Sequence, residues 1–304
     1  MKRRDFLAAG AAVLLTSPMR AQAQQVPFSA GTQAPRLKVP PLACDCHMHI
    51  YDSRFPAAAN ATIKPPDATV ADYRKLQARL GTTRNVVVTP STYGTDNRVT
   101  LAAIEQLGPT ARGVGVVGPD VTMAELKKLH DGGVRGIRFN LAVGAFLKPE
   151  MIAPLSRKVA ELNWHVQVNM APDLLVSLSD TLADLPTPIV LDHLARIPQP
   201  AGVAHPAFAV VRRLLDKGHG WVKLSGLYIS SADGSPDFAD AGTVAAAFVQ
   251  AAPERVLWGS DWPHPTKAEK PDDAALLDLV GRWAPQEPMR QRIFVDNPAK
   301  LFGF

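Results

Sequence analysis

The stretch CDCHMHIYD at residues 44–52 places two histidines, His47 and His49, one residue apart among an aspartate and two cysteines. Such a group could bind a metal, form a redox pair, or be an ordinary strand with polar residues. Side chains alternate along a strand, so Asp45, His47 and His49 would share one face, and Cys44 and Cys46 would share the other. Two parallel cysteine side chains with Cα atoms about 6.5 Å apart or more are at the limit for a disulfide, so we predict two small buried thiols.

Two other polar residues end strongly apolar runs far along the chain. His193 ends TPIVLDH at residues 187–193, and Asp261 ends RVLWGSD at residues 255–261. Inward-facing imidazoles cost stability unless they are hydrogen-bonded or liganded, so two in register need a reason. We predict that His47, His49, His193 and Asp261 meet in one site. The other histidines fall in helical or connecting stretches or at the opposite rim, and we interpret them as structural or surface residues: His130, His165, His205 and His219.

The elements that would position these residues form a repeating pattern. A helix-like stretch, such as 70–81, 98–108, 122–133 or 205–218, follows nearly every apolar, β-rich run, with typical start and stop residues. The runs lie at 43–50, 84–90, 112–118, 133–140, 164–170, 187–193, 220–226 and 255–261. Eight strands alternating with helices predict a single-domain α/β protein, a (β/α)8 TIM barrel over residues 43–304. In that fold chemistry sits at the carboxyl ends of the strands, where the polar residues collect.

The first residues have the layout of an export signal. Lys2, Arg3 and Arg4 precede a short apolar run, and the AQAQ stretch that follows has small-x-small cleavage spacing. The twin arginine with Phe6-Leu7 favours twin-arginine export of a folded protein, so we expect a cleavable signal at 1–23 and a periplasmic mature chain. The apolar run is shorter than the ~20 residues that span a bilayer; a retained membrane anchor is the alternative. Residues 24–42 have no periodicity and predict an arm before the barrel.

The charge of the chain excludes one class of partner. The whole chain has a formal net charge of +5. The predicted leader holds four of the basic residues and one acidic residue, so the mature chain keeps 29 basic against 27 acidic residues. Without a lysine or arginine stripe, nucleic acid is not an expected partner. The expected partners are a small-molecule substrate and, for the precursor, the twin-arginine export machinery.

Several motifs occur in the order of a known family. His-x-His at strand 1, LDHLAR at 191–196, VLWGSDWPHP at 256–265 and DNPAKLFGF at 296–304 resemble the amidohydrolase superfamily. STYGTDNR at 91–98 and GVRGIRFN at 133–140 make the resemblance closest to its lactonase branch, which includes 2-pyrone-4,6-dicarboxylate lactonase and D-galactarolactone isomerase. The resemblance covers nearly all of the mature chain and implies a barrel enzyme acting on a lactone.

The resemblance also bears on a metal cofactor. The two-metal sites of this superfamily use a lysine or glutamate at strand 4 and a histidine at strand 5, whereas this chain offers Arg138, Asn140, Asn169 and Met170 there. We therefore expect no two-metal site. A single divalent metal such as zinc on His47, His49 and Asp261, with or without His193, is chemically reasonable because three protein ligands plus water make a catalytic zinc site. The lactonase branch is thought to act without metal, so no cofactor is favoured.

A metal-free lactonase needs a base for water and donors for the carbonyl oxygen. Asp261 is the only strand-end carboxylate in the predicted set, so it is the expected base, with His47, His49 and His193 polarising the carbonyl. Arg138 could grip a substrate carboxylate in bidentate fashion, and Arg196 is a second anchor. Further predicted substrate contacts are Ser91, Tyr93, Asn97, Tyr228 and His264.

The leading function is therefore a hydrolase that opens a carboxylated lactone, of the pyrone-dicarboxylate or sugar-acid type. Two departures from the branch, Ile229 after Tyr228 and Thr89 at strand 2, weaken assignment to the pyrone dicarboxylate. One alternative is a galactarolactone-type isomerase, in which a hydroxyl of the substrate replaces water as the nucleophile. The other is a non-catalytic periplasmic binding barrel, which would have no need of a base.

Overall fold

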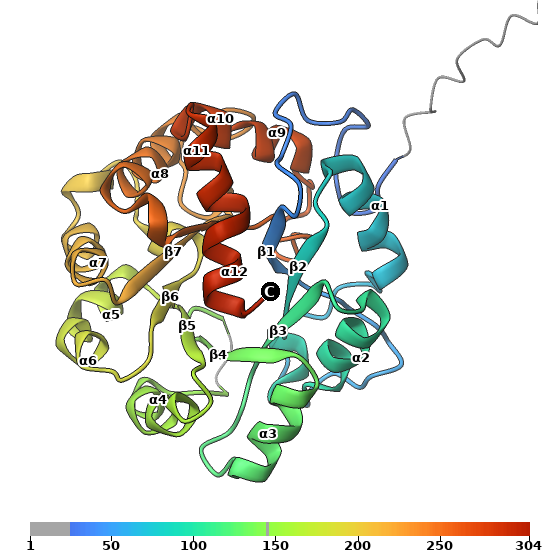
Figure 1. Cartoon of the computed structure of the whole chain (residues 1–304), viewed down its shortest axis with the longest axis vertical. Helices are drawn as coiled ribbons and strands as arrows, with labels where there is room; N and C mark the ends of the chain where they lie inside the picture. Colours follow the sequence, from blue (N-terminus) through green and yellow to red (C-terminus); the bar gives the residue numbers. More distant parts are fainter. Residues whose placement is uncertain (1–24, 144–145) are drawn as a thin grey trace, which may run out of the picture.

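Eight parallel strands form one sheet in the order of the sequence and curl into a nearly closed barrel (Figure 1). The computed structural model describes residues 25–143 and 146–304. The strands are β1 (Cys44–Met48), β2 (Arg84–Val88), β3 (Ala111–Gly115), β4 (Val134–Asn140), β5 (His165–Asn169), β6 (Ile189–Leu191), β7 (Gly220–Leu224) and β8 (Val256–Trp258). The predicted TIM barrel and its eight strands are confirmed. The predicted signal segment lies in residues 1–24, outside the described residues.

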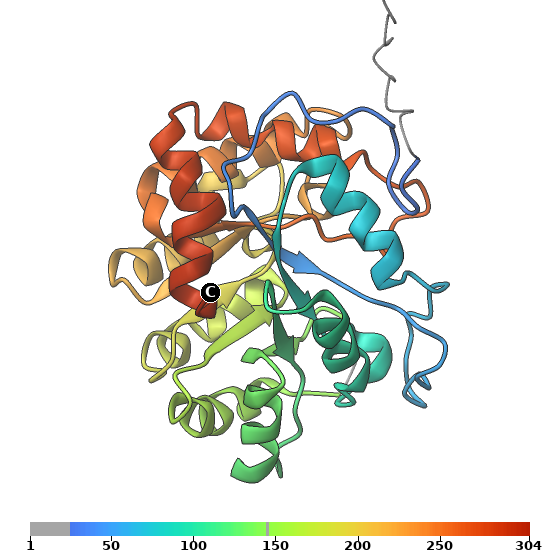
Figure 2. The ribbon, with the colours of Figure 1, turned by 45° about the vertical axis from the view of Figure 1, so that its right-hand side comes forward.

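Helices surround the barrel and cover its outer face (Figures 1 and 2). They are α1 (Val70–Leu80), α2 (Arg98–Leu107), α3 (Met123–Asp131), α4 (Ile152–Ala160), α5 (Pro172–Ser177), α6 (Ser179–Ala183), α7 (Pro206–Asp216), α8 (Ala239–Ala251), α9 (Asp273–Asp278), α10 (Val280–Trp283), α11 (Glu287–Gln291) and α12 (Asn297–Phe302). The helix predicted at 70–81 shows why the local signals worked. Thr69 and Asp72 form a capping box, and Gly81 ends α1 in the left-handed conformation.

One end of the barrel is filled by apolar side chains. Cys44 and Cys46 are free and buried in a cluster with Val86, Val114 and Trp221. Phe302 of α12 belongs to the same cluster, and Figure 1 shows α12 lying across this end of the barrel. The absence of a disulfide between the two cysteines was predicted correctly. With this end closed, the carboxyl ends of the strands are the open end of the barrel.

The segment before β1 packs along the outside of the barrel, near α1 and α9 (Figures 1 and 2). Residues 25–42 contain neither helix nor strand. The backbone carbonyl of Pro27 accepts a hydrogen bond of 2.8 Å from the indole of Trp262, and the backbone N–H of Leu37 donates to Asp278 at 2.8 Å. These contacts attach the segment to the part of the chain that follows β8.

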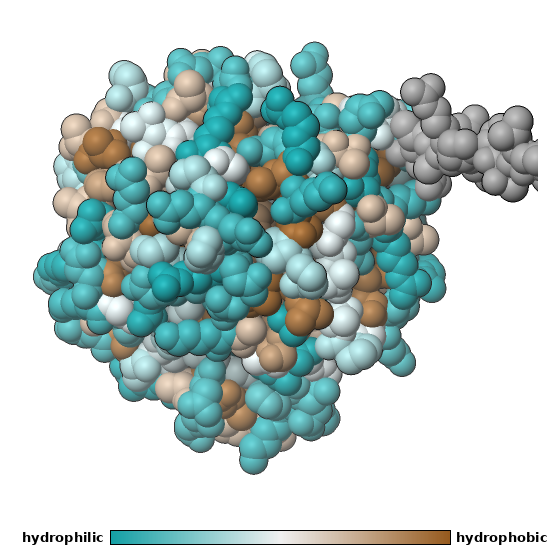
Figure 3. Space-filling model, turned by 45° about the horizontal axis from the view of Figure 1, so that its top comes forward, coloured by the Kyte–Doolittle hydropathy of each residue, from teal (hydrophilic) through white to brown (hydrophobic). Residues whose placement is uncertain are grey.

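The outer surface carries few large apolar side chains. The face seen in Figure 3 is mostly hydrophilic, with hydrophobic residues in small separate groups. Across residues 25–143 and 146–304, none of the helices combines the length and hydrophobicity that a membrane span requires.

Candidate active site

The barrel closes between β1 and the segment after β8, and this closure assembles the site. The backbone N–H of Asp261 donates to the carbonyl of His47 at 2.8 Å, and that of His49 donates to the carbonyl of Trp262 at 2.8 Å. A Cβ atom on Gly259 would lie 2.6 Å from the Cβ of His47, so only glycine allows this approach. The GSDWP motif therefore brings Asp261 against the two strand-1 histidines.

Asp45 supports this closure from outside the barrel. Its carboxylate accepts hydrogen bonds from the backbone N–H and the hydroxyl of Ser260, at 2.9 and 2.6 Å, and from the Tyr73 hydroxyl of α1 at 3.0 Å. The prediction that Asp45 shares a face with His47 and His49 is wrong, because the register of β1 shifts between Asp45 and Met48. Such a shift breaks the strict alternation of side chains.

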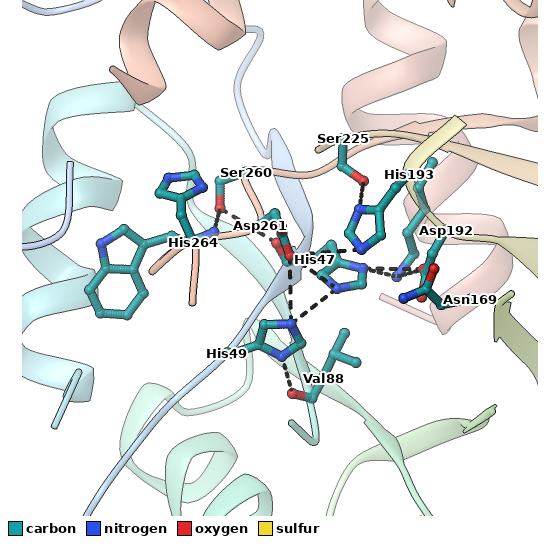
Figure 4. A network of polar contacts seen from close by, with 12 residues as sticks. His47, His49, Val88, Asn169, Asp192, His193, Ser225, Ser260, Asp261 and His264 are labelled. Carbon is teal, nitrogen blue, oxygen red and sulfur yellow. Dashed lines mark hydrogen bonds and ion pairs between the residues drawn. The ribbon is translucent and has the colours of Figure 1, made fainter. Parts of the chain in front are cut away.

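Three imidazoles surround one oxygen of Asp261 (Figure 4). Its Oδ1 lies 3.6 Å from Nε2 of His47, 3.6 Å from Nε2 of His49 and 3.9 Å from Nε2 of His193. The first two Nε2 atoms are 3.3 Å apart. These distances show that the four predicted site residues meet. All four residues are buried.

The hydrogen-bond partners of His49 and His193 bear on where the ring hydrogens lie. Nδ1 of His49 is 2.7 Å from the carbonyl of Val88, which can only accept, so this nitrogen carries a hydrogen. Nδ1 of His193 is 3.0 Å from the Ser225 hydroxyl, which can donate to it and leave the hydrogen on Nε2. His193 begins a left-handed turn in which residues 193–196 all have positive φ, a conformation that the expectation of a strand end at His193 did not include.

A buried layer of charges lies beneath the histidines. Asp192 accepts from Nε of Arg138 at 2.9 Å and lies 3.3 Å from Nδ1 of His47. The ammonium of Lys223 is 3.1 Å from the same Nδ1, 2.7 Å from Oε1 of Gln167 and 3.7 Å from Asp192. Lys223 can donate to Nδ1 of His47, whereas Asp192 can accept a hydrogen from the same nitrogen, so this layer accommodates either tautomer of His47.

The environment sets the charge states. Burial alone would raise the pKa of Asp261, but His193, His49 and His47 outweigh burial and hold the pKa of this carboxyl below its ordinary value. Burial lowers the pKa of both His47 and His193, which favours the neutral form of these two rings. The site thus combines an ionised carboxylate with two imidazoles whose charged form burial disfavours.

A cavity of about 320 Å³ opens over this group. Seven predicted site residues line it: His49, Ser91, Arg138, His193, Arg196, Tyr228 and Asp261. Other lining residues include Tyr51, Asn140, Asn169 and Lys267. The cavity therefore offers cationic groups on more than one wall and an anionic base on its floor.

Four predicted site residues are not among the residues that line the cavity: His47, Tyr93, Asn97 and His264. Both polar atoms of the Asn97 side chain bond the backbone of Val116, at 2.7 and 2.8 Å. The Tyr93 hydroxyl bonds the backbone of Asp52. His47 lies behind the rings that face the cavity, and His264 lies behind Tyr228. The geometry therefore does not support the direct substrate contacts predicted for Tyr93, Asn97 and His264.

One wall of the cavity is an ordered row of amides. Asn169 donates to Asn140 at 3.0 Å, and Asn140 donates to the Ser91 hydroxyl at 2.7 Å. The Ser91 oxygen accepts, so its own hydrogen is free for a group in the cavity. Oδ1 of Asn169 is buried without a hydrogen-bond partner. This wall can bond carboxylate oxygens or hydroxyl groups.

Comparison with known proteins identifies the family. A family profile described as amidohydrolase matches residues 44–304. The chain belongs to the amidohydrolase family. The match starts at β1 and ends at the last residue, so it covers the whole barrel of this amidohydrolase.

This amidohydrolase has curated relatives that match most of its length. It is 39% identical over 289 residues to the 4-sulfomuconolactone hydrolase of Rhizobium radiobacter, covering 89% of this chain and 95% of the relative. It is 30% identical over 274 residues to the D-galactarolactone isomerase of Agrobacterium fabrum, covering 88% and 94%. The crystal structure of a probable 2-pyrone-4,6-dicarboxylic acid hydrolase from Acinetobacter baumannii, with citric acid bound, matches with a TM-score of 0.75 and 28% identity over 86% of this chain and 100% of that one.

The amidohydrolase site has the donors for one metal ion. Nε2 of His47, Nε2 of His49 and Oδ1 of Asp261 lie within 4.8 Å of one another. Their separations of 3.3–3.6 Å suit three ligands around one zinc ion, so the residues fit. Ligation would require the Nε2 lone pair of His47 and hence a hydrogen on its Nδ1, which the Asp192 carboxylate 3.3 Å away can accept.

The charged layer of Asp192, Arg138 and Lys223 was not predicted from the sequence. Asp192, directly after β6, is a second strand-end carboxylate that the predicted set of site residues did not contain. Asp192 directly precedes His193 in LDHLAR. Lys223 lies two residues from both Trp221 and Ser225, in a strand that is otherwise apolar. That period of two could have placed Lys223 inside the barrel. Arg138, predicted as a substrate anchor, donates from its Nε to Asp192 and is also one of the residues that line the cavity.

Proposed function

We propose that the protein is a lactonase that opens a carboxylated lactone with a water molecule activated by Asp261. The observation that carries the proposal is the ionised Asp261, held against three imidazoles under a cavity with cationic walls. Similarity to lactone hydrolases and to a lactone isomerase over 88–90% of the chain supports it. Arg138, Arg196 and Lys267 suit a substrate that bears more than one anionic group.

The proposed chemistry uses the residues in distinct roles. Oδ1 of Asp261 takes a proton from water as the oxygen forms a bond to the lactone carbonyl carbon. Nε2–H of His193 donates to the carbonyl oxygen as negative charge develops there. When the bond between the acyl carbon and the ring oxygen breaks, Asp261 returns the proton to the ring oxygen, and the product is the open hydroxy acid. His47 and His49 hold Asp261 rather than the substrate.

A panel of lactones in oxygen-18 water tests the proposal and its main alternative. We expect release of acid from a dianionic lactone, with the label in one carboxylate. The amide wall of Ser91, Asn140 and Asn169 also suits a hydroxylated sugar lactone, which favours isomerisation as the second candidate. Conversion of a sugar lactone without incorporation of label would identify the isomerase. Failure to convert any lactone of the panel would favour the binding barrel.

Metal removal is expected to leave the activity intact. If a divalent ion were bound, His47, His49 and Asp261 would hold it, and it would supply Lewis acidity toward water or the carbonyl. We propose the metal-free form, because the Lys223 ammonium lies 3.1 Å from Nδ1 of His47 and its positive charge opposes a cation on the other side of that ring. Elemental analysis of the purified protein and assays after dialysis against a chelator check this. Stoichiometric zinc whose removal abolishes turnover and whose return restores it would contradict the metal-free form.

We also propose that the protein acts in the periplasm after export through the twin-arginine route. The Arg3-Arg4 pair and the small-residue cleavage stretch support the proposal. Cell fractionation of the wild type and of a double Arg→Lys variant at these two positions would decide it. Equal amounts of periplasmic protein from both would contradict the twin-arginine route.

A further inference from the structure

A chain of hydrogen bonds runs from Asp261 through Tyr228, at the wall of the cavity, into the protein interior. The Tyr228 hydroxyl donates to Oδ2 of Asp261 at 2.6 Å. The hydroxyl oxygen of Tyr228 also lies 2.9 Å from Nδ1 of His264. Nε2 of His264 is 3.2 Å from each oxygen of Asp273, the first residue of α9. His264 and Asp273 are fully buried. These residues form a continuous line, which we call the Asp273–Tyr228 chain.

The chemistry of the donors fixes the direction of this chain. Tyr228 has one hydroxyl hydrogen, and a carboxylate oxygen 2.6 Å away is the acceptor that must receive it. If the hydrogen pointed to His264 instead, two oxygens would face each other without a hydrogen between them. The Tyr228 oxygen therefore accepts from Nδ1–H of His264. The other ring nitrogen of His264, Nε2, lies against the carboxylate of Asp273.

The chain separates the two oxygens of Asp261. Oδ2 is occupied by Tyr228, whereas Oδ1 faces the three histidines and the cavity. The backbone of Asp261 is held at its N–H by His47. Rotation of the carboxylate is then the remaining freedom by which the base could leave its position.

We propose that Tyr228, held by His264 and Asp273, is the positioning residue that keeps Oδ1 of Asp261 aimed at the attacking water. The proposal rests on the proposed function of Asp261 as the base. It gives Tyr228 and His264 a role other than the substrate contacts predicted for them. His264 and Asp273 act on the reaction only through Tyr228.

Tyr228→Phe removes the hydroxyl and keeps the ring. We expect kcat for lactone opening to fall about 10- to 100-fold with KM within about threefold, because the base loses its orientation but the cavity keeps its shape. Tyr93→Phe is the matched control, since that hydroxyl bonds the backbone of Asp52 and does not contact Asp261. The kcat of Tyr93→Phe should stay within about twofold of the wild type. A Tyr228→Phe variant with the kcat of the wild type would overturn the proposal.

Substitutions at His264 test the chain one step further out. The side-chain amide of asparagine can place an N–H near the position of Nδ1, whereas leucine cannot. We expect His264→Leu to lower kcat about tenfold and His264→Asn to restore most of the loss. A leucine variant with wild-type kcat, or an asparagine variant as slow as the leucine variant when both are folded, would contradict the chain. If His264→Leu does not fold, Tyr228→Phe still decides the matter.

Crystal structures of the Tyr228→Phe and Tyr93→Phe variants test the proposal without turnover. We expect the Asp261 carboxylate to rotate away from its wild-type orientation in the first and to keep it in the second. An unrotated carboxylate in Tyr228→Phe would overturn the positioning role. If the wild type opens no lactone, the proposed function fails, whereas this structural comparison still shows whether Tyr228 holds Asp261.

Discussion

Asp261→Asn is expected to lower kcat for lactone opening about 10²- to 10⁴-fold, because the amide cannot take a proton from water. The substitution keeps the size of the side chain and an oxygen for Tyr228, so the fold should be unchanged. KM should change little, since Arg138 and Arg196 remain to bind the anionic groups. Steady-state kinetics with the best lactone of the panel measure the effect.

The control for this variant is Asp96→Asn. Asp96 pairs with the exposed Arg98 and does not line the cavity, so its loss should leave kcat within about twofold. The wild-type pH profile adds a second check. The pKa of Asp261 is held below its ordinary value, so kcat/KM should not fall on account of this group between pH 7 and 5. If Asp261→Asn opened the lactone with the kcat of the wild type, Asp261 would not be the general base.

Asp192→Asn is expected to have the largest effect on stability. Its carboxylate is the buried anion among Arg138, Lys223 and His47, and removal of one partner of a buried ion pair costs about 3–5 kcal/mol. Urea unfolding followed by circular dichroism measures the change. Asp237→Asn, which breaks the exposed pair with Arg282, should change the free energy of unfolding by less than about 1 kcal/mol.

The effect of Asp192→Asn should depend on pH. Burial alone would raise the pKa of Asp192, but His47, Arg138 and Lys223 outweigh it and hold this pKa well below its ordinary value. A carboxyl whose pKa is lowered on folding stabilises the protein above its unfolded pKa of about 3.9 and loses that contribution as the pH falls. The difference between wild type and variant should therefore be full at pH 7 and shrink below about pH 4. A difference that is the same at pH 3 and pH 7 would show that Asp192 does not act as an anion.

The sequence by itself determined the barrel and the four central site residues. Apolar runs alternating with capped helices have few other ways to bury both faces of a parallel sheet. Once the barrel is known, the carboxyl ends of β1, β6 and β8 must bring His47, His49, His193 and Asp261 to the same rim. Local signals such as the capping box at Thr69 involve only a few neighbouring residues, so they can be recognised in the sequence before the fold is known.

Only the tertiary structure decided how those residues are held. The register shift in β1 turned Asp45 outward, and the left-handed turn at 193–196 aimed His193; both depend on the neighbouring chain. Asp192 and Lys223 became partners because β6 and β7 lie side by side in the barrel, and Tyr228, His264 and Asp273 became a chain because the segments after β7 and β8 pack together. Such contacts join residues distant in sequence whose polar groups must be satisfied once buried, and periodicity carries no information about which group satisfies which.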